Sequence, residues 1–444
     1  MELYSKYYAN IWNFIRKILL LQRQRMNVTE MKNRTIARFI QQKAQTKFGR
    51  ILVLTGARQT GKTTLVRKTF PDYVYISVED PLIRSTFLNL TAQQWAKLYP
   101  AALIDEIQKV PSLIESIKAT YDQYVEPHYV LLGSSQLLLM EKVRESLAGR
   151  CTIIDMYPLT LPELQTKSWH DTISDSYFQK LINHEENDYP PSFLLDKNRY
   201  EKINAYSHYL KYGGFPAISE DDSDENDKYD WLNNYVRTYL ERDIRDLASF
   251  RELEPFVKLQ HCLALQTGNL INASAIAGQL GINVKTVQRY IKYFEISYQS
   301  IVLPAWSRNQ HKRMSKSPKI HYIDHGIVQA VLHKRGGMTG CEYESAIIAE
   351  MYKQAKNNHS SAQFSFIRTY DGVEVDLLIE FPDHYYAFEI KMANRVTQND
   401  ARHLFGLDEI LDKPLKKAFL LSNDEETKQF NDKTIAIHAA MFLG

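Results

Sequence analysis

Eight residues near the start of the chain have the types and spacing that bind phosphate. The segment GARQTGKT, residues 56–63, fits the P-loop pattern G-x-x-x-x-G-K-[ST], follows the apolar run ILVLT and precedes a helix-like stretch. Backbone N–H groups of such a loop surround a β-phosphate at a helix N-terminus, where the helix dipole favours anions. A tight turn without a ligand is the alternative. The residues expected to bind ATP are Gly56, Ala57, Arg58, Gln59, Thr60, Gly61, Lys62, Thr63 and Thr64.

Two acids that end a later apolar run are candidates for the hydrolysis of a bound nucleotide. Lys62 is expected to reach the β- and γ-phosphate oxygens, and Thr63 to offer its hydroxyl to Mg²⁺. The strand-like run AALIDE ends in Asp105 and Glu106, 43 residues after Lys62. We expect Asp105 to hold the water shell of Mg²⁺ and Glu106 to orient and deprotonate the attacking water.

Three more polar residues stand next to strand-like runs. YVLLGSSQ ends in Ser134 and Ser135, either of which is placed to contact the attacking water or the γ-phosphate. We assign Ser134 to nucleotide binding and Ser135 to catalysis. LAGR puts Arg150 directly before the fifth strand-like run, CTIIDM.

A second set of charged residues lies near the end of the chain, in EVDLLIEFPDHYYAFEIK. With Phe381–His384 as the loop of a hairpin, Asp376 faces Glu389 and Glu374 faces Lys391. Directly opposed like charges destabilise a sheet, and a divalent cation with oxygen ligands would compensate. A solvated strand face is the alternative, because a register slip of one residue would undo the pairing.

One further carboxylate belongs to this set. In EYESAIIAEMYKQ, Glu344 stands one turn before Ile347 and Ile348, so it shares the apolar side of a helix and points inward. A buried carboxylate needs a partner. The candidate ligands of Mg²⁺ or Mn²⁺ are therefore Glu344, Asp376 and Glu389, with Lys391 beside them.

The middle of the chain carries clustered cations. INASAIAGQLGINVKTVQRYIKYFE has two short helical patterns around Gly281-Ile282-Asn283, which predicts a helix-turn-helix, and strand-like segments after it indicate a winged helix. The loop SRNQHKRMSKSPK adds Arg308, Lys312, Arg313, Lys316 and Lys319. Such cations suit DNA or RNA phosphates; protein docking and simple solvation are the alternatives. The candidate nucleic-acid contacts are Lys285, Arg289, Lys292, Lys312 and Arg313.

The elements that must position these residues follow from the apolar patterns. Five strand-like runs separated by helix-length segments between residues 51 and 156 predict a parallel α/β sheet. The predicted domains are an N-terminal amphipathic extension (1–33), an ATPase core (34–165), a linker with a helical lid (166–262), a winged helix (263–335) and a C-terminal α/β domain (336–444). The formal net charge of +3 gives no whole-chain argument for nucleic acid.

The ATPase motifs resemble the AAA+-like branch of P-loop ATPases. In that group an arginine before the fifth strand reaches the ATP site of a neighbouring subunit, which for Arg150 implies a homo-oligomer. An arginine that caps a helix C-terminus is the alternative. From about residue 34 the chain is further similar to a family of uncharacterised bacterial and archaeal ATPases, on GARQTGKTT, LIDEIQKVP, LLGSSQLLL, SLAGR, YPLTLPEL, KYGGFPA and TYLERDIRDL. Ala57 replaces the proline usual in that family, which should alter loop stiffness more than chemistry.

The charged set at the C-terminus resembles the PD-(D/E)xK nuclease fold, a restriction-endonuclease-like α/β domain. That resemblance implies that Asp376 and Glu389 bind Mg²⁺ and that Lys391 activates water or stabilises the phosphorane charge. We therefore expect an ATPase whose nucleotide state controls cleavage of DNA or RNA, in defence against foreign nucleic acid. The alternative is an ATP-driven switch whose C-terminal domain recognises a protein or nucleic acid without cutting it.

Cellular context follows from what the sequence lacks. Three widely spaced cysteines, Cys151, Cys262 and Cys341, form neither a disulfide framework nor a zinc pattern, which suits a reducing cytoplasm. The N-terminal run IWNFIRKILLLQ is too short and too charged to span a bilayer. We expect a cytoplasmic protein without a membrane span.

Overall fold

The first apolar runs of the chain form a parallel sheet, which confirms the expected α/β class. The computed structural model describes residues 31–133, 143, 145–185, 190–219, 224–239, 253–309, 311, 313, 316–370 and 372–444. The sheet has the strand order β2-β3-β4-β1-β5, and every neighbouring pair is parallel. Its strands are β1 (Ile51–Gly56), β2 (Val74–Ser77), β3 (Ala101–Asp105), β4 (His128–Leu132) and β5 (Thr152–Met156).

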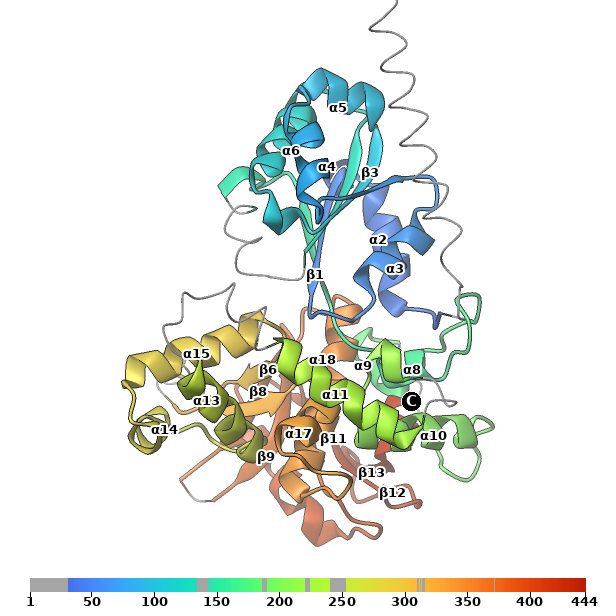
Figure 1. The fold of residues 1–444 in the computed structure, drawn as a ribbon. Helices are drawn as coiled ribbons and strands as arrows, with labels where there is room; N and C mark the ends of the chain where they lie inside the picture. Colours follow the sequence, from blue (N-terminus) through green and yellow to red (C-terminus); the bar gives the residue numbers. More distant parts are fainter. Residues whose placement is uncertain are drawn as a thin grey trace, which may run out of the picture.

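Helices cover both faces of this sheet, which forms the upper lobe in Figure 1. Apolar side chains of the strands enter two separate buried clusters, one on each face, which explains why the strands read as continuous apolar runs. The helices are α2 (Thr35–Ala44), α3 (Lys62–Thr69), α4 (Pro81–Leu88), α5 (Ala92–Leu98) and α6 (Ser112–Gln123), with short 3₁₀ turns at Lys47–Gly49 and Ile107–Lys109.

The middle of the chain is mostly helical. The expected helix-turn-helix is present as α14 and α15, with Gly281 in the left-handed conformation (φ +66°) where the first helix ends. An antiparallel pair, β6 and β7, follows it. The bounds are α8 (Leu161–Leu164), α9 (Tyr177–Ile182), α10 (Arg199–Tyr212), a 3₁₀ turn (Pro216–Ile218), α11 (Glu225–Tyr239), α13 (Glu254–Leu265), α14 (Ala273–Leu280), α15 (Val284–Ile296), β6 (Ser300–Leu303), β7 (Lys319–Tyr322) and α17 (His325–Val331).

The C-terminal part is a mixed sheet with the order β12-β13-β11-β10-β9-β8. Strands β10, β11 and β13 run parallel, while β8 and β9 extend the sheet in antiparallel fashion. The elements are α18 (Gly340–Asn357), β8 (Gln363–Arg368), β9 (Glu374–Glu380), β10 (Tyr385–Ile390), a 3₁₀ helix (Gln398–Leu404), α19 (Leu407–Ile410), β11 (Leu415–Ser422), β12 (Lys428–Gln429), β13 (Thr434–His438) and α20 (Ala439–Leu443).

The hairpin of β9 and β10 has the register that the sequence predicts. Tyr385 pairs with Glu380 and Phe388 with Leu377, and the N–H of Phe381 donates to the carbonyl of His384 across the loop. Continuing this register places Asp376 opposite Glu389. The hairpin therefore brings the two acids to the same end of the strands.

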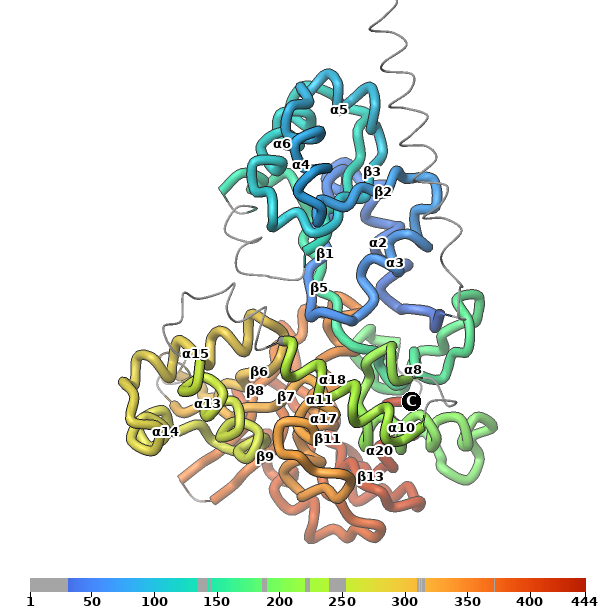
Figure 2. The backbone as a smooth tube through the Cα atoms, in the orientation of Figure 1, coloured from blue at the N-terminus to red at the C-terminus, as the bar shows by residue number. Residues whose placement is uncertain are grey.

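Helix α18 contacts the segment that leads out of the parallel sheet after β5. Figure 2 traces the backbone of both lobes. Glu350 and Lys353 form an ion pair with no exposed surface. Glu350 also accepts from the N–H of Leu161 (2.6 Å), and Lys353 donates to the carbonyl of Leu159 (3.0 Å). Both bonds reach the segment that follows β5 and fix it to the C-terminal domain.

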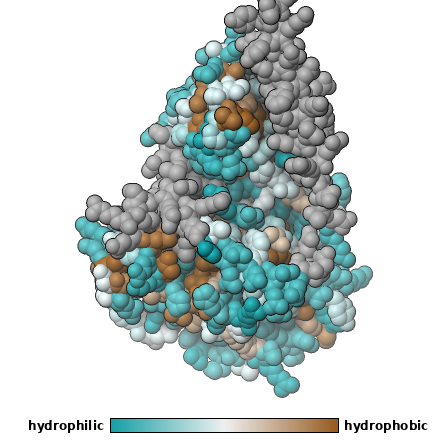
Figure 3. Space-filling model, in the orientation of Figure 1, coloured by the Kyte–Doolittle hydropathy of each residue, from teal (hydrophilic) through white to brown (hydrophobic). Residues whose placement is uncertain are grey.

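The surface of the upper lobe carries exposed apolar side chains near α4, visible as a brown patch in Figure 3. Leu82 is 83% exposed, and Ile83 and Leu88 are each 41% exposed. Over the ranges given above, no helix is long and apolar enough to cross a membrane. The predicted N-terminal amphipathic helix lies largely outside the described residues.

Candidate functional site

The phosphate-binding loop connects the carboxyl end of β1 to the first turn of α3. Gly56 has φ +148°, and a Cβ there would lie 2.2 Å from the carbonyl oxygen of Met156 on β5. Gly61 has φ +89° and precedes the first residue of α3. Both positions therefore require glycine, for close approach and for backbone conformation respectively.

Lys62 is the first residue of α3, and its ammonium group folds back into the loop. It donates to the carbonyls of Gly56 (2.8 Å) and Ala57 (2.7 Å), and only 9% of the residue is exposed. The loop thus holds a buried positive charge at a helix N-terminus, an arrangement that favours an anion.

Asp105 lies next to this loop, at the end of the adjacent strand β3. Its Oδ2 accepts from the Thr63 hydroxyl (2.7 Å) and from the Tyr75 hydroxyl (2.9 Å), and 8% of the residue is exposed. A carboxylate and a hydroxyl in contact are hard oxygen ligands of the kind that Mg²⁺ prefers. The residues present therefore fit the expected Mg²⁺, and Tyr75 is a contact that the sequence analysis missed.

Glu106 follows Asp105 in the left-handed conformation (φ +58°), which is uncommon outside glycine. Its Oε2 accepts from the amide of Gln108 (2.8 Å) and lies 4.0 Å from the ammonium of Lys109. Glu106 is thus a residue of strained backbone directly after the end of β3. Strained residues of this kind concentrate at functional sites.

Arg34 is a second residue that the sequence analysis missed. Its guanidinium donates to the carbonyls of Thr60 (3.0 Å) and Tyr157 (2.6 Å), and its Nε lies 3.2 Å from Glu163. Only 2% of Arg34 is exposed. It therefore fixes the phosphate-binding loop to the segment after β5. The available signal was an arginine directly before an amphipathic helix.

Three further residues are expected at the ATP site: Ser134, Ser135 and Arg150. Ser134 and Ser135 lie outside the described residues, so their assignment stays a prediction. Arg150 forms an ion pair with Asp122 of the same chain, with its Nε 2.7 Å from Oδ1 and its Nη2 3.2 Å from Oδ2. The contact with a neighbouring subunit therefore stays a prediction too.

A tyrosine connects the ATPase lobe to the middle of the chain. Tyr298 lies just after α15. Its hydroxyl donates to Asp155 of β5 (2.5 Å) and lies 2.6 Å from the Thr55 hydroxyl. Thr55 directly precedes Gly56 of the phosphate-binding loop. Tyr298 is buried, has φ +60°, and packs edge-on against Tyr157 with 5.6 Å between ring centroids.

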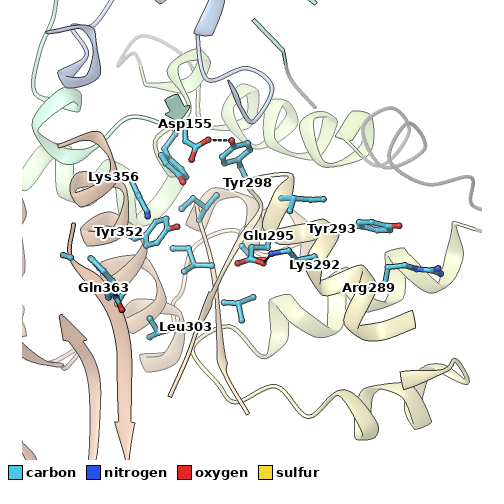
Figure 4. A pocket seen from close by; sticks show the side chains of 18 residues that line it. Asp155, Arg289, Lys292, Tyr293, Glu295, Tyr298, Leu303, Tyr352, Lys356 and Gln363 are labelled. Atoms are coloured by element: carbon cyan, nitrogen blue, oxygen red, sulfur yellow. Dashed lines mark hydrogen bonds and ion pairs between the residues drawn. The ribbon is translucent and has the colours of Figure 1, made fainter. Parts of the chain in front are cut away.

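This junction opens into a pocket of about 700 Å³ between the lobes, drawn in Figure 4. Its wall combines Arg289, Lys292 and Tyr293 from α15 with Tyr352 and Lys356 from α18. Cations and aromatic rings that line the same pocket suit phosphates and stacked bases. Lys292 is also paired with Glu295, at 2.6 Å.

The candidate carboxylates of the C-terminal domain gather as expected, but around an unexpected group. The ammonium of Lys319 lies 3.0 Å from Glu344, 3.0 Å from Glu374 and 3.9 Å from Asp376. Placing Lys319 in a solvated basic loop is therefore wrong, because this residue opens β7 and its side chain is 4% exposed. The signal available was a lysine that begins an otherwise apolar strand, KIHYI.

The remaining members of the set take other partners. Asp376 accepts from the N–H of Ile390 (2.8 Å), and Glu389 accepts from Lys391 (2.6 Å). Continuing the observed register places Glu374 opposite Lys391 as predicted, but the ion pair of Glu374 is with Lys319, at 3.0 Å. The second oxygen of Glu389, Oε2, is buried and has no hydrogen-bond partner.

Burial shifts the titration of these groups. Burial first, and the charge of Asp376 second, raise the pKa of Glu344 to about 8 and that of Glu389 to about 7. Burial alone would lower the pKa of Lys319, but Glu344, Asp376 and Glu374 raise it above its ordinary value. Lys319 is therefore held as a cation.

The predicted Mg²⁺ or Mn²⁺ does not fit this arrangement. Divalent cations bind carboxylate oxygens at about 2.0–2.6 Å. Here the ammonium of Lys319 occupies the position between the carboxylates that such an ion would need. Across the described part of the chain, no three aspartate, glutamate, histidine or cysteine side chains gather closely enough to hold a metal ion. The predicted metal ligation is thus not seen.

Other cations of the predicted basic patch bind the protein itself. Arg308 donates to the carbonyls of Glu409, Ile410 and Leu411, and Arg313 pairs with Glu380 at 2.8 Å. Lys312 lies outside the described residues. By contrast, three exposed cations share one face of α15, at positions i, i+4 and i+7: Lys285, Arg289 and Lys292.

Three family models match separate parts of the chain. Residues 49–165 match a model described as AAA domain. Residues 203–336 match a domain of unknown function, DUF8612, and residues 339–442 match another, DUF4143. The phosphate-binding loop and the acids after β3 lie inside the first match. The chain therefore contains an ATPase-like AAA domain, which implies nucleotide binding.

The chain is also similar to proteins of several bacteria and archaea. An uncharacterised protein of Mycobacterium tuberculosis is 24% identical over 404 residues, which cover 88% of this chain and 81% of that protein. One from Haemophilus influenzae is 23% identical over 383 residues, with 79% and 85% covered. Among solved structures, the Walker-type ATPase of Pyrococcus abyssi has a TM-score of 0.43 and 13% identity, covering 69% of this chain and 99% of that one.

Proposed function

We propose that the chain binds and hydrolyses ATP with Mg²⁺. The contact between the Thr63 hydroxyl and Asp105, beside the buried Lys62, is the observation that carries this proposal. Thr63 and Asp105 would hold Mg²⁺, and the bound ion would neutralise part of the phosphate charge. Lys62 would bind the β- and γ-phosphate oxygens in place of its present carbonyl partners.

Glu106 supplies the base in this proposal. Its carboxylate, held by Gln108, orients the attacking water and accepts its proton. Arg34 positions the loop by bonding the carbonyl of Thr60. Ser134, Ser135 and Arg150 remain the proposed additional contacts of the γ-phosphate.

ATP turnover by purified Lys62→Ala tests the assignment of the phosphate-binding loop. Losing the buried ammonium group of the loop should reduce phosphate release to background, and ATP affinity should fall with it. Lys68→Ala is the matched control, since Lys68 lies in the last turn of the same helix, away from the loop. Full turnover by Lys62→Ala would contradict the proposal.

We propose further that the rest of the chain is a recognition module switched by the nucleotide state. The hydrogen bonds of Tyr298 with Thr55 and Asp155 connect the loop region to α15, and the bonds of α18 reach the segment after β5. The exposed cations of α15 and the pocket beside them favour a nucleic-acid strand as the partner, with α14 and α15 read as part of a winged helix. A protein partner is the alternative.

Nucleotide-controlled cleavage of DNA or RNA, in defence, is the second candidate function. The register that brings Asp376 to Glu389, with Lys391 beside them, favours it. The ammonium of Lys319 argues against cleavage, because it lies among the carboxylates that would have to bind the metal ion. Incubating labelled DNA or RNA with the protein, ATP and Mg²⁺ or Mn²⁺ decides: cleavage that disappears in Asp376→Ala and Lys391→Ala would establish this function.

A further inference from the structure

Four carboxylates of the C-terminal domain form a largely buried cluster around the ammonium group of Lys319, which belongs to another part of the chain. The carboxylate cluster consists of Glu344 on α18, Glu374 and Asp376 on β9, and Glu389 on β10. Lys319 comes from β7, outside the mixed sheet. The side chains of Lys319, Asp376 and Glu389 are 4%, 9% and 6% exposed, so water does little to screen their charges.

The backbone of Lys319 is fixed from two sides. It pairs with Leu303 of β6 in the antiparallel ladder and forms an isolated bridge with Leu270. Its ammonium group also lies 5.5 Å from the centre of the Phe366 ring on β8. The side chain is therefore held in the cluster by the strand it belongs to.

The ammonium occupies the place that a cation would need. Lysine offers three donors, and three carboxylates lie between 3.0 and 3.9 Å from its nitrogen. These are hydrogen-bond and ion-pair distances, longer than metal–oxygen bonds. A divalent ion between the same oxygens would clash with the ammonium and repel its charge.

The cluster nevertheless holds more carboxyl groups than cations. Four acids face Lys319 and Lys391, with Arg368 4.0 Å from Glu374 at the exposed edge. In addition, the Oε2 of Glu389 is buried without a partner, which is costly unless a proton or cation satisfies it. In their present positions these carboxylates do not surround a metal site. Removing Lys319 would leave them without that cation and able to turn toward a hard cation.

We propose that Lys319 takes the place of a divalent cation in the carboxylate cluster, and that loss of its ammonium group converts the cluster into a metal site. The C-terminal domain then works without a metal while β7 stays in place. This inference concerns a site separate from the phosphate-binding loop, so ATP turnover reports on the proposed ATPase independently.

Mn²⁺ binding to the full chain without nucleotide, followed by electron paramagnetic resonance, tests this inference. All proteins carry Asp105→Asn to remove the proposed metal ligand of the ATP site. With Lys319 present, Mn²⁺ affinity should be the same whether residue 376 is aspartate or asparagine. Lys319→Met should bind one Mn²⁺ per chain about tenfold more tightly or better, because the competing charge is gone.

Two controls separate this effect from general changes. Lys316→Met removes an exposed lysine three residues earlier and should leave Mn²⁺ affinity unchanged. Adding Asp376→Asn to Lys319→Met should abolish the gain. The inference is overturned if the protein with Lys319 intact binds Mn²⁺ in an Asp376-dependent manner, or if folded Lys319→Met gains no affinity. If Lys319→Met does not fold, comparing the Mn²⁺ affinity of proteins with aspartate or asparagine at residue 376, both with Lys319 intact, still tests the inference.

Discussion

At the scale of single residues, burial gives the same side-chain types opposite tasks in the two halves of the chain. Lys62 is a buried cation that donates to two neutral carbonyls of its own loop, and in the proposed function it exchanges them for phosphate. Lys319 is a buried cation whose partners are carboxylates, so displacing it would leave buried charges unpaired. The first lysine suits ligand binding and the second suits a fixed internal role.

The raised pKa of Glu389 predicts a pH dependence of local stability. The pKa is raised to about 7, by burial first and by Asp376, from an ordinary value near 4.5. Between these values the folded state binds the proton more tightly than the unfolded state. Local stability should therefore fall as pH rises through this window, by on the order of 1 kcal/mol per pH unit.

Hydrogen exchange of the β9 and β10 amides, corrected for intrinsic rates, measures this effect. Glu389→Gln should make the dependence shallower, because one of the two carboxyl groups with a pKa raised to near neutral is gone and Glu344 remains. Glu380→Gln is the control at the far end of β9: Lys413 and Arg313 outweigh burial and lower the pKa of Glu380, so its loss should not flatten the curve. An equally steep fall in Glu389→Gln would contradict the assignment.

At the scale of elements, the sequence predicts best what local patterns determine. All five strand-like runs of the ATPase lobe form the parallel sheet, because each is an apolar run bounded by turn residues. The register of β9 and β10 is also predictable, since the loop Phe381–His384 fixes it. Both results rest on residues close together in the sequence.

Contacts between distant segments are what the sequence does not reveal. In the sequence, Lys319 is one of several cations of a basic segment. In the structure, β7 places it against α18 and β9. Arg34 and Tyr298 reach the phosphate-binding loop from segments 26 and 243 residues away from their partners Thr60 and Thr55. Such contacts depend on tertiary packing, so the local patterns around Lys319 and Arg34 can mark a residue worth noting but do not identify its partners.

Tyr298 tests whether α15 is coupled to the ATP site. Tyr298→Phe keeps the ring against Tyr157 but removes the hydroxyl that bonds Asp155 and lies beside Thr55. We expect the fold and ATP binding to persist, while the change in hydrogen exchange of α15 and α18 on adding ATP shrinks. Tyr293→Phe, on the pocket wall, is the control. An unchanged response in Tyr298→Phe would place the coupling elsewhere.

At the scale of the whole molecule, the segment after β5 is where the lobes meet. Arg34 bonds its Tyr157 carbonyl, and α18 bonds Leu159 and Leu161. A rearrangement around ATP therefore has a direct route into the C-terminal domain. Exposed leucines near α4 leave part of the upper lobe available for contact with another molecule.

Mixing two inactive variants tests the proposed homo-oligomer. If Arg150 completes the ATP site of a neighbouring subunit, mixing Arg150→Ala with Lys62→Ala should restore part of the turnover that each lacks alone. Asp122→Asn is the control, because it releases Arg150 from its present partner without removing the cation. No recovery on mixing would mean that Arg150 acts only within its own chain, as in the ion pair with Asp122.

The central claim, that this chain hydrolyses ATP with Glu106 as the base beside Asp105, is tested most directly by ATP binding and turnover of Glu106→Gln. Glutamine keeps the size of the side chain but cannot accept the proton of the attacking water. We predict wild-type ATP affinity with turnover reduced by about 10²–10⁴-fold. Turnover equal to that of the wild type, with ATP bound normally, would contradict this account.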